Sequence, residues 1–115
     1  MNTDEIQQAL LDMMIRTAEI KAEWDLLRKK ILSNTRLPRS IRLAINLVAA
    51  RANDKLNGIA DHVITGMDNL EDGLLGAARM DLGTCMNEMM LNETADRMVA
   101  LMVRKTYLNE KHDQH

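Results

Sequence analysis

Residues 4–32 read DEIQQALLDMMIRTAEIKAEWDLLRKKIL. Within this stretch, a row of mostly apolar residues recurs at alternating steps of four and three: Ile6, Leu10, Met13, Thr17, Ile20, Trp24, Leu27 and Ile31. This alternation is the heptad pattern, which places every member of the row on one stripe of an α-helix. The stretch therefore predicts one long helix over about 4–32, which packs this stripe, called the inner seam below, against other helices.

The length of this helix points to a second copy of the chain. The helix would extend roughly 43 Å at about 1.5 Å per residue, whereas a compact globule of this size is only about 35 Å across. We therefore expect the inner seam to overhang one subunit and a homodimer to cover it, either as an intertwined bundle or as a coiled-coil pair, with the two copies parallel or antiparallel. The expected dimer seam consists of Leu10, Met13, Thr17, Ile20, Trp24, Leu27 and Ile31.

The seam composition favours a bundle of several helices. Thr17 and Trp24 occupy positions that coiled coils usually give to aliphatic residues. Phe is absent, and Trp24 and Tyr107 are the only aromatic residues. Sheets favour aromatic and β-branched residues, so this composition predicts an all-α fold.

Turn and capping residues divide the rest of the chain. Pro38 predicts a turn, with Ser40 as the N-cap of the next helix. Gly66 can end that helix and Asn69 can cap another, so we place a break between them, although one helix over 40–82 is the alternative. The expected single domain spans 1–115 and is a four-helix bundle with helices at about 4–32, 40–64, 69–82 and 84–111 and a polar tail at 110–115.

Composition and segment polarity also bear on location. The lone Cys85 excludes an intramolecular disulfide and fits a reducing compartment. The first residues are acidic where a secretory signal would be basic. No run approaches the roughly 18 apolar residues of a membrane span. We expect a cytoplasmic protein that does not enter the membrane.

Charge is segregated along the chain, although the net charge is only −2. Residues 1–25 carry six acids and two bases, residues 26–60 carry eight bases and one acid, and residues 61–96 carry eight acids and one base. Blocks of opposite sign can pair within the fold, between protomers, or with an outside partner. The pattern alone leaves these three alternatives open.

The basic block contains the strongest candidate binding site. A turn followed by a helix N-terminus can present guanidinium and amide groups together to a phosphate or carboxylate. A pI near 5.9 and the scarcity of aromatic residues count against duplex and single-stranded nucleic acid. The plain alternative is a solvated helix connection that pairs with the acidic block. The candidate residues are Arg28, Lys29, Lys30, Arg36, Arg39 and Arg42.

Methionines crowd the C-terminal half of the chain. Met at helical spacing is ordinary core filling, and its adaptability also suits a surface that repacks against a partner. Thioethers beside Cys85 could bind Cu(I), because soft ligands select soft metals, but core filling is the better explanation and we predict no metal. The candidate partner groove consists of Met86, Met89, Met90, Met98 and Met102.

Catalytic signals are weak. The segment 61–66 resembles the motif of histidine phosphotransfer bundles, in which a glycine follows the histidine by four residues, but Thr65 stands where those modules carry lysine. We interpret His62 as a structural surface histidine and Cys85 as an unreactive buried thiol. No histidine has a neighbour at metal-ligand spacing, and no glycine-rich loop follows a strand. We expect no enzymatic activity and no cofactor.

Two functional hypotheses follow from these features. The first is a non-enzymatic helical adaptor, inhibitor or regulatory protein that acts through protein–protein interaction, as small regulators of phages and mobile elements do. The second is a ligand-binding module in which Arg36, Arg39 and Arg42 capture a phosphate-bearing small molecule or nucleic acid. An enzyme, the third alternative, would need Cys85 or His62.

Overall fold

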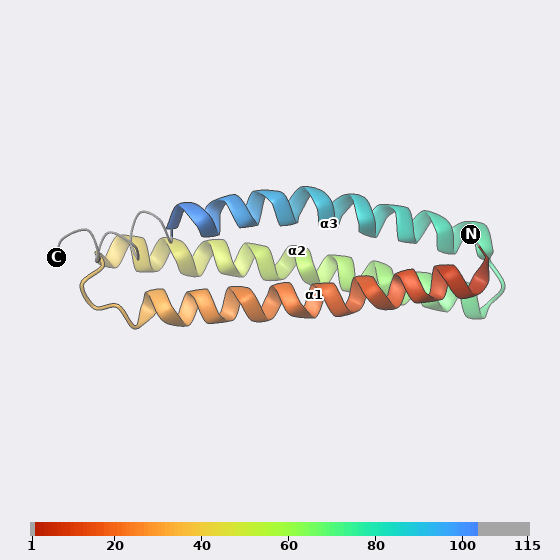
Figure 1. Cartoon of the computed structure of the whole chain (residues 1–115), viewed down its shortest axis with the longest axis horizontal. Coiled ribbons are helices and arrows are strands. Elements are labelled where there is room, and N and C mark those ends of the chain that lie inside the picture. The colour runs from red at the N-terminus through yellow and green to blue at the C-terminus, as the bar shows by residue number, and fades with distance from the viewer. Residues whose placement is uncertain (1, 104–115) are drawn as a thin grey trace.

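The chain forms three long helices, each antiparallel to the one before it: α1 (Thr3–Leu32), α2 (Arg39–Glu71) and α3 (Leu75–Val103) (Figure 1). This computed structural model describes the backbone of residues 2–103 and the side chains of residues 2–91, 97 and 101. The molecule is a rod of 60 × 22 × 17 Å. The prediction of an all-α fold is confirmed over the described residues.

Local chemistry explains the bounds of α1. The Asn2 side chain accepts a hydrogen bond from the Glu5 amide at 2.9 Å, and the Glu5 carboxylate accepts one from the Asn2 amide, which completes a capping box. Lys29 and Lys30 lie in the last turn, where cations complement the helix dipole. The observed helix agrees with the prediction at 4–32.

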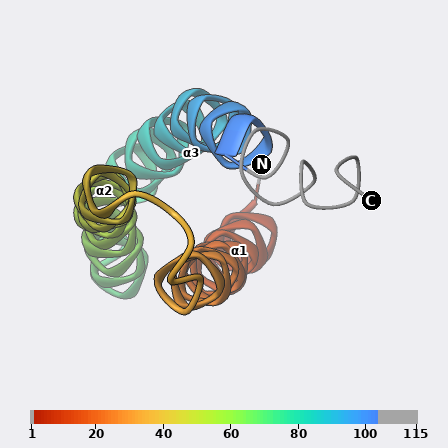
Figure 2. The same cartoon turned by 90° about the vertical axis from the view of Figure 1, so that its left-hand side faces the viewer.

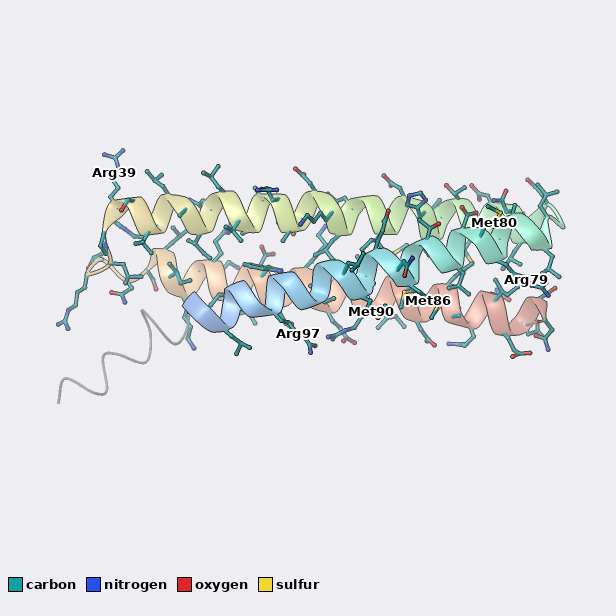
Figure 3. All side chains as sticks on the ribbon, turned by 90° about the horizontal axis from the view of Figure 1, so that it is seen from above. Arg39, Arg79, Met80, Met86, Met90 and Arg97 are labelled. Carbon is teal, nitrogen blue, oxygen red and sulfur yellow. The ribbon has the colours of Figure 1, made fainter. Side chains whose placement is uncertain are left out.

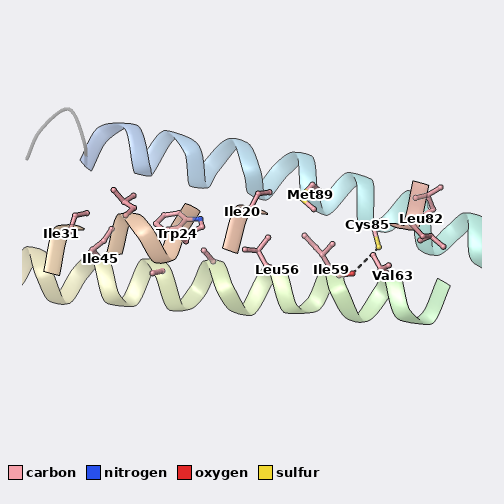
Figure 4. Close-up of a cluster of buried hydrophobic side chains, with 14 of the residues drawn as sticks. Ile20, Trp24, Ile31, Ile45, Leu56, Ile59, Val63, Leu82, Cys85 and Met89 are labelled. Atoms are coloured by element: carbon pink, nitrogen blue, oxygen red, sulfur yellow. Dashed lines mark hydrogen bonds between the residues drawn. The ribbon is translucent and has the colours of Figure 1, made fainter. Parts of the chain in front are cut away.

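The inner seam lies in the core of one chain. Seven of its eight residues are buried and Met13 is half-buried. Thr17 is accommodated because its hydroxyl donates to the Met13 carbonyl at 2.7 Å. Figure 4 shows the seam meeting matching stripes from the other two helices. These stripes consist of Ile45, Ala49, Ala52, Leu56, Ile59 and Val63 from α2, and Ala78, Leu82, Cys85 and Met89 from α3.

The prediction that α1 is too long for one subunit to cover is wrong. It assumed a compact shape, with a radius of gyration of about 13 Å for a chain of this size, whereas the observed value is 17.7 Å. Since α2 and α3 are about as long as α1, one chain covers the whole inner seam. The length of α1 therefore gives no support to a homodimer, which stays a prediction.

The predicted break near Gly66 is also wrong, because α2 continues through it to Glu71. A Cβ built on Gly66 would lie 3.1 Å from a Leu10 methyl group and 3.3 Å from the Asp81 Cβ. The glycine thus permits close packing of the three helices, at a helix-propensity cost of about 1 kcal/mol. The chain turns instead at Gly73, whose φ of 77° suits glycine.

The predicted boundary between 82 and 84 is absent, since α3 is unbroken from Leu75 to Val103. The four-helix prediction is therefore corrected to three helices over residues 2–103. The predicted polar tail at 110–115 lies outside the described residues. The predicted N-cap Ser40 is replaced by Pro38, and α2 begins at Arg39.

The middle helix holds the other two together. Lys21 of α1 donates to the Asn57 side chain of α2 at 2.8 Å, and Asn69 of α2 donates to Asp81 of α3 at 2.7 Å. Both α1 and α3 contact α2 extensively, whereas they contact each other much less (Figure 2). The rod is consequently least closed on the side between α1 and α3.

Candidate interaction surfaces

The six predicted basic residues gather at one end of the rod. Arg28, Lys29 and Lys30 close α1, Arg36 lies in the connection, and Arg39 and Arg42 open α2. Figure 3 shows Arg39 projecting from the tip of the rod. We call this set of six residues the basic end.

The basic end gathers positive charge without local neutralisation. The N-cap of α2 is Pro38, which makes no side-chain cap, and the first turn of α2 contains no acid. The N-terminus of α2 adds a partial positive charge to that of Arg39 and Arg42. Within the described part of the chain, none of the six side chains of the basic end forms an ion pair. Pairing with the acidic block, one of the alternatives that the sequence leaves open, is therefore not observed there.

Two arginines of the basic end are partly sunk into the fold. Arg28 and Arg42 are half-buried, and the buried Nε of each has no hydrogen-bond partner among the described atoms. Lys29, Lys30, Arg36 and Arg39 are exposed. The site therefore offers four freely accessible cations and two guanidinium groups held against the bundle.

Acidic side chains gather at the opposite end of the rod. Because α1 and α2 are antiparallel, the start of α1 lies beside the end of α2 (Figure 1). This acidic end consists of Asp4, Glu5, Asp68, Glu71 and Asp72, all exposed. The segregation seen in the sequence thus becomes a charge polarity along the long axis.

The predicted methionine groove separates into core and surface. Met89 is buried against α2, whereas Met86 and Met90 are 53% and 63% exposed. Figure 3 places these two along one edge of α3 together with Arg79 and Arg97, and Met80 on the opposite edge. The side chains of Met98 and Met102 lie outside the described residues. We call Met86 and Met90 the methionine edge.

A surface that the sequence analysis missed lies on the outer face of α1. Its members recur at steps of four, three, four and four, on the side of the helix opposite the inner seam: Leu11, Ile15, Ala18, Ala22 and Leu26. All five are exposed, and Leu26 is 68% exposed. The spacing was readable in the sequence, but it was overshadowed by the stronger inner seam. We call this row the outer seam.

The chemistry of Cys85 is that of a packed thiol. Cys85 is fully buried, and its Sγ donates to the Ile59 carbonyl at 3.7 Å (Figure 4). Burial, together with the charges of Glu88 and Asp81, raises its pKa from 9.0 to about 11. The thiol is therefore protonated at neutral pH, and no hydrogen bond joins it to the half-buried His62. Nucleophilic chemistry requires the thiolate.

The described residues contain neither a metal-binding cluster nor a helix that could span a membrane. No group of three or more His, Cys, Asp or Glu side chains is placed to hold a metal ion. No helix combines the length and apolarity needed to cross a bilayer.

Comparisons with known proteins give no relative. No protein-family model, no curated protein and no solved structure matches the chain.

Proposed function

We propose that the chain is a non-enzymatic adaptor, inhibitor or regulatory protein that binds an amphipathic helix of a partner protein at the methionine edge. The observation behind this proposal is the exposure of Met86 and Met90 on the edge of α3 that points away from α2 (Figure 3), next to the side on which the described parts of α1 and α3 contact each other least. Helix-in-groove recognition uses apolar side chains on one face of the partner, and flexible Met side chains adapt to it.

The energetics of this site favour an apolar partner. Covering apolar surface gains roughly 25 cal/mol per Å², and Met86 and Met90 offer such surface because they are 53% and 63% exposed. Met89 packs beneath them in the core, so the backbone of this edge is held in place by the bundle. A partner helix would thus meet a positioned surface with mobile side chains.

Photocrosslinking can test the site. A benzophenone amino acid would replace Met86, Met90 or, as the matched control, Met80, which is also on α3 and 75% exposed but lies on its opposite edge. We expect crosslinking in native cells to yield the same partner from positions 86 and 90 and not from position 80. With that partner purified, Met90→Glu should weaken binding at least tenfold and Met80→Glu should not. Equal effects at positions 80 and 90 would contradict the proposal.

The basic end supports a second candidate function, the binding of a phosphate-bearing ligand or nucleic acid. The specific observation is the absence of ion pairs, within the described residues, around six cations beside a helix N-terminus that has no acidic cap. Such a terminus and its guanidinium groups are suited to phosphate.

Charge reversal separates the two candidates. Arg39→Glu with Arg42→Glu should abolish binding of nucleotides or DNA while leaving binding at the methionine edge intact. Arg51→Glu is the control, because Arg51 is an exposed cation of the same helix outside the basic end. If wild-type protein binds neither inorganic phosphate, nucleotide nor DNA in calorimetry at low salt, the second candidate is excluded.

A further inference from the structure

The outer seam of α1 is an apolar stripe that no described residue of the chain covers. The inner seam already contacts α2 and α3, so α1 presents a second heptad-like stripe to water. Leu11, Ile15 and Leu26 are 42%, 57% and 68% exposed. A helix with apolar stripes on both sides packs between two partners, and the described residues supply only one of them.

We infer that a second copy of this chain covers the outer seam, with the two α1 helices antiparallel. This inference concerns a different surface from the proposed partner site and does not rest on it. The small residues Ala18 and Ala22 at the middle of the seam let two helix axes approach closely. The larger Leu11 and Leu26 lie at its ends, and Ile15 lies as far from its centre as Ala22 does.

Antiparallel pairing makes these sizes complementary. When the centres of the two seams coincide, Leu11 lies opposite Leu26 of the partner subunit, and Ile15 lies opposite Ala22 of the partner subunit. Each chain contributes the same residues to both halves of the contact, as a twofold interface requires. Ala18 of each chain then lies at the middle of the interface, between the two pairs that Ile15 and Ala22 form.

Charge determines the direction of pairing. The line of the outer seam begins with Asp4 and continues to Lys29, both exposed. Antiparallel helices place Asp4 and Glu5 of one copy within about a helical turn of Lys29 and Lys30 of the other, whereas parallel helices would align like charges. The acidic and basic ends of the whole rods also lie beside each other in the antiparallel arrangement. This charge complementarity between two copies therefore supports a second copy of the chain as the partner that covers the outer seam.

The oligomeric state can be measured by sedimentation at micromolar concentration. We expect a particle of twice the 13.1 kDa chain mass. Ile15→Glu should produce a monomer, because it places a charge within the apolar seam. Leu47→Glu is the matched control, since Leu47 is a 69% exposed leucine on α2, and it should leave the dimer intact. Circular dichroism and the emission of buried Trp24 would verify that both variants fold.

Two results would overturn this interface. The first is a wild-type monomer at the highest soluble concentration, and the second is a dimer that Ile15→Glu leaves unchanged in a folded protein.

Thiol crosslinking can establish the direction. Gln8→Cys and Lys29→Cys place exposed thiols near opposite ends of the outer seam, and Cys85 remains as it is because it is buried. With a short bifunctional maleimide, a mixture of the two variants should give a crosslinked pair containing one chain of each. Gln8→Cys alone should give little product. Efficient linkage of Gln8→Cys to itself would show parallel pairing and refute the proposed arrangement.

Discussion

Gly66 and Gly58 lie in the same helix but face different surroundings. A Cβ at position 66 would press on Leu10 and Asp81, whereas nothing lies within 4 Å of a Cβ at position 58. We expect Gly58→Ala to raise the free energy of unfolding by about 0.5–1 kcal/mol through helix propensity. Gly66→Ala should lower it by about 1 kcal/mol, because the overpacking exceeds the propensity gain. Urea denaturation monitored by circular dichroism would measure both, and a stabilising Gly66→Ala would contradict the packing argument.

The raised pKa of Cys85 should slow the reaction of its thiol with alkylating reagents. A shift from 9.0 to about 11 leaves about a hundredfold fewer thiolates at pH 8. We therefore expect alkylation by iodoacetamide to be at least a hundredfold slower in the folded protein than in denaturant. Rapid modification of folded protein at pH 8 would show that the thiol is accessible and activated.

The same pKa sets a pH dependence of stability. Because the folded-state pKa lies above the unfolded value, Cys85 stabilises the fold fully below pH 9.0 and loses that contribution as pH rises through about 11. Between these values, the unfolding free energy of the wild type should fall more steeply than that of Cys85→Ala. Parallel curves for the two proteins would contradict this assignment. The comparison removes the common titration of lysines.

At the scale of elements, α1 was the helix best predicted from sequence. Its heptad row predicted both the helix and its buried face, because the spacing of apolar residues can be read from a single sequence. The break at Gly66 was mispredicted because glycine propensity is visible in the sequence, whereas the contact of Leu10 with Gly66 depends on the fold. The chain turns at Asp72 and Gly73, and Asp-Gly is a pair that is common in turns. The sequence did not single out this pair, because other glycines lie nearby in the same apolar pattern.

The candidate surfaces were predictable to different degrees. The basic end was identified because its residues are close in sequence and flank one turn. The methionine set was only partly resolved, since a stripe that includes Met89 and an edge that includes Met90 differ by one residue and hence by about 100° around the helix. The packing of α3 on α2 decides which of the two is buried.

The capping box makes the start of α1 sensitive to one side chain. Asn2→Ala removes the acceptor for the Glu5 amide and should lower the unfolding free energy by about 1 kcal/mol. Asn2→Asp keeps an acceptor oxygen and adds a charge that the helix dipole favours, so it should retain wild-type stability. Thermal denaturation of the two variants would check this. An equal loss in both would show that the cap is not the cause.

At the scale of the whole molecule, shape and charge act together. Three helices of similar length form a 60 Å rod rather than a globule, so the separated charge blocks of the sequence become its two ends. The two ends of the rod carry opposite charge. When two copies lie side by side and antiparallel, each end lies beside the oppositely charged end of the other copy. The proposed dimer combines this antiparallel arrangement with contact between the outer seams of α1, and it uses none of the residues of the methionine edge.

The charge polarity predicts how the proposed dimer responds to salt and to charge exchange. Raising ionic strength toward 1 M, where the Debye length falls to about 3 Å, should weaken dimerisation, because part of the attraction is between exposed ends. Lys29→Glu should weaken it several-fold at low salt. Adding Asp4→Lys to the same chain should restore it, since an antiparallel pair brings the two altered positions together at both ends. Sedimentation equilibrium across a salt series would measure each dissociation constant. If the double variant dimerises more weakly than Lys29→Glu alone, the two positions do not meet across the interface.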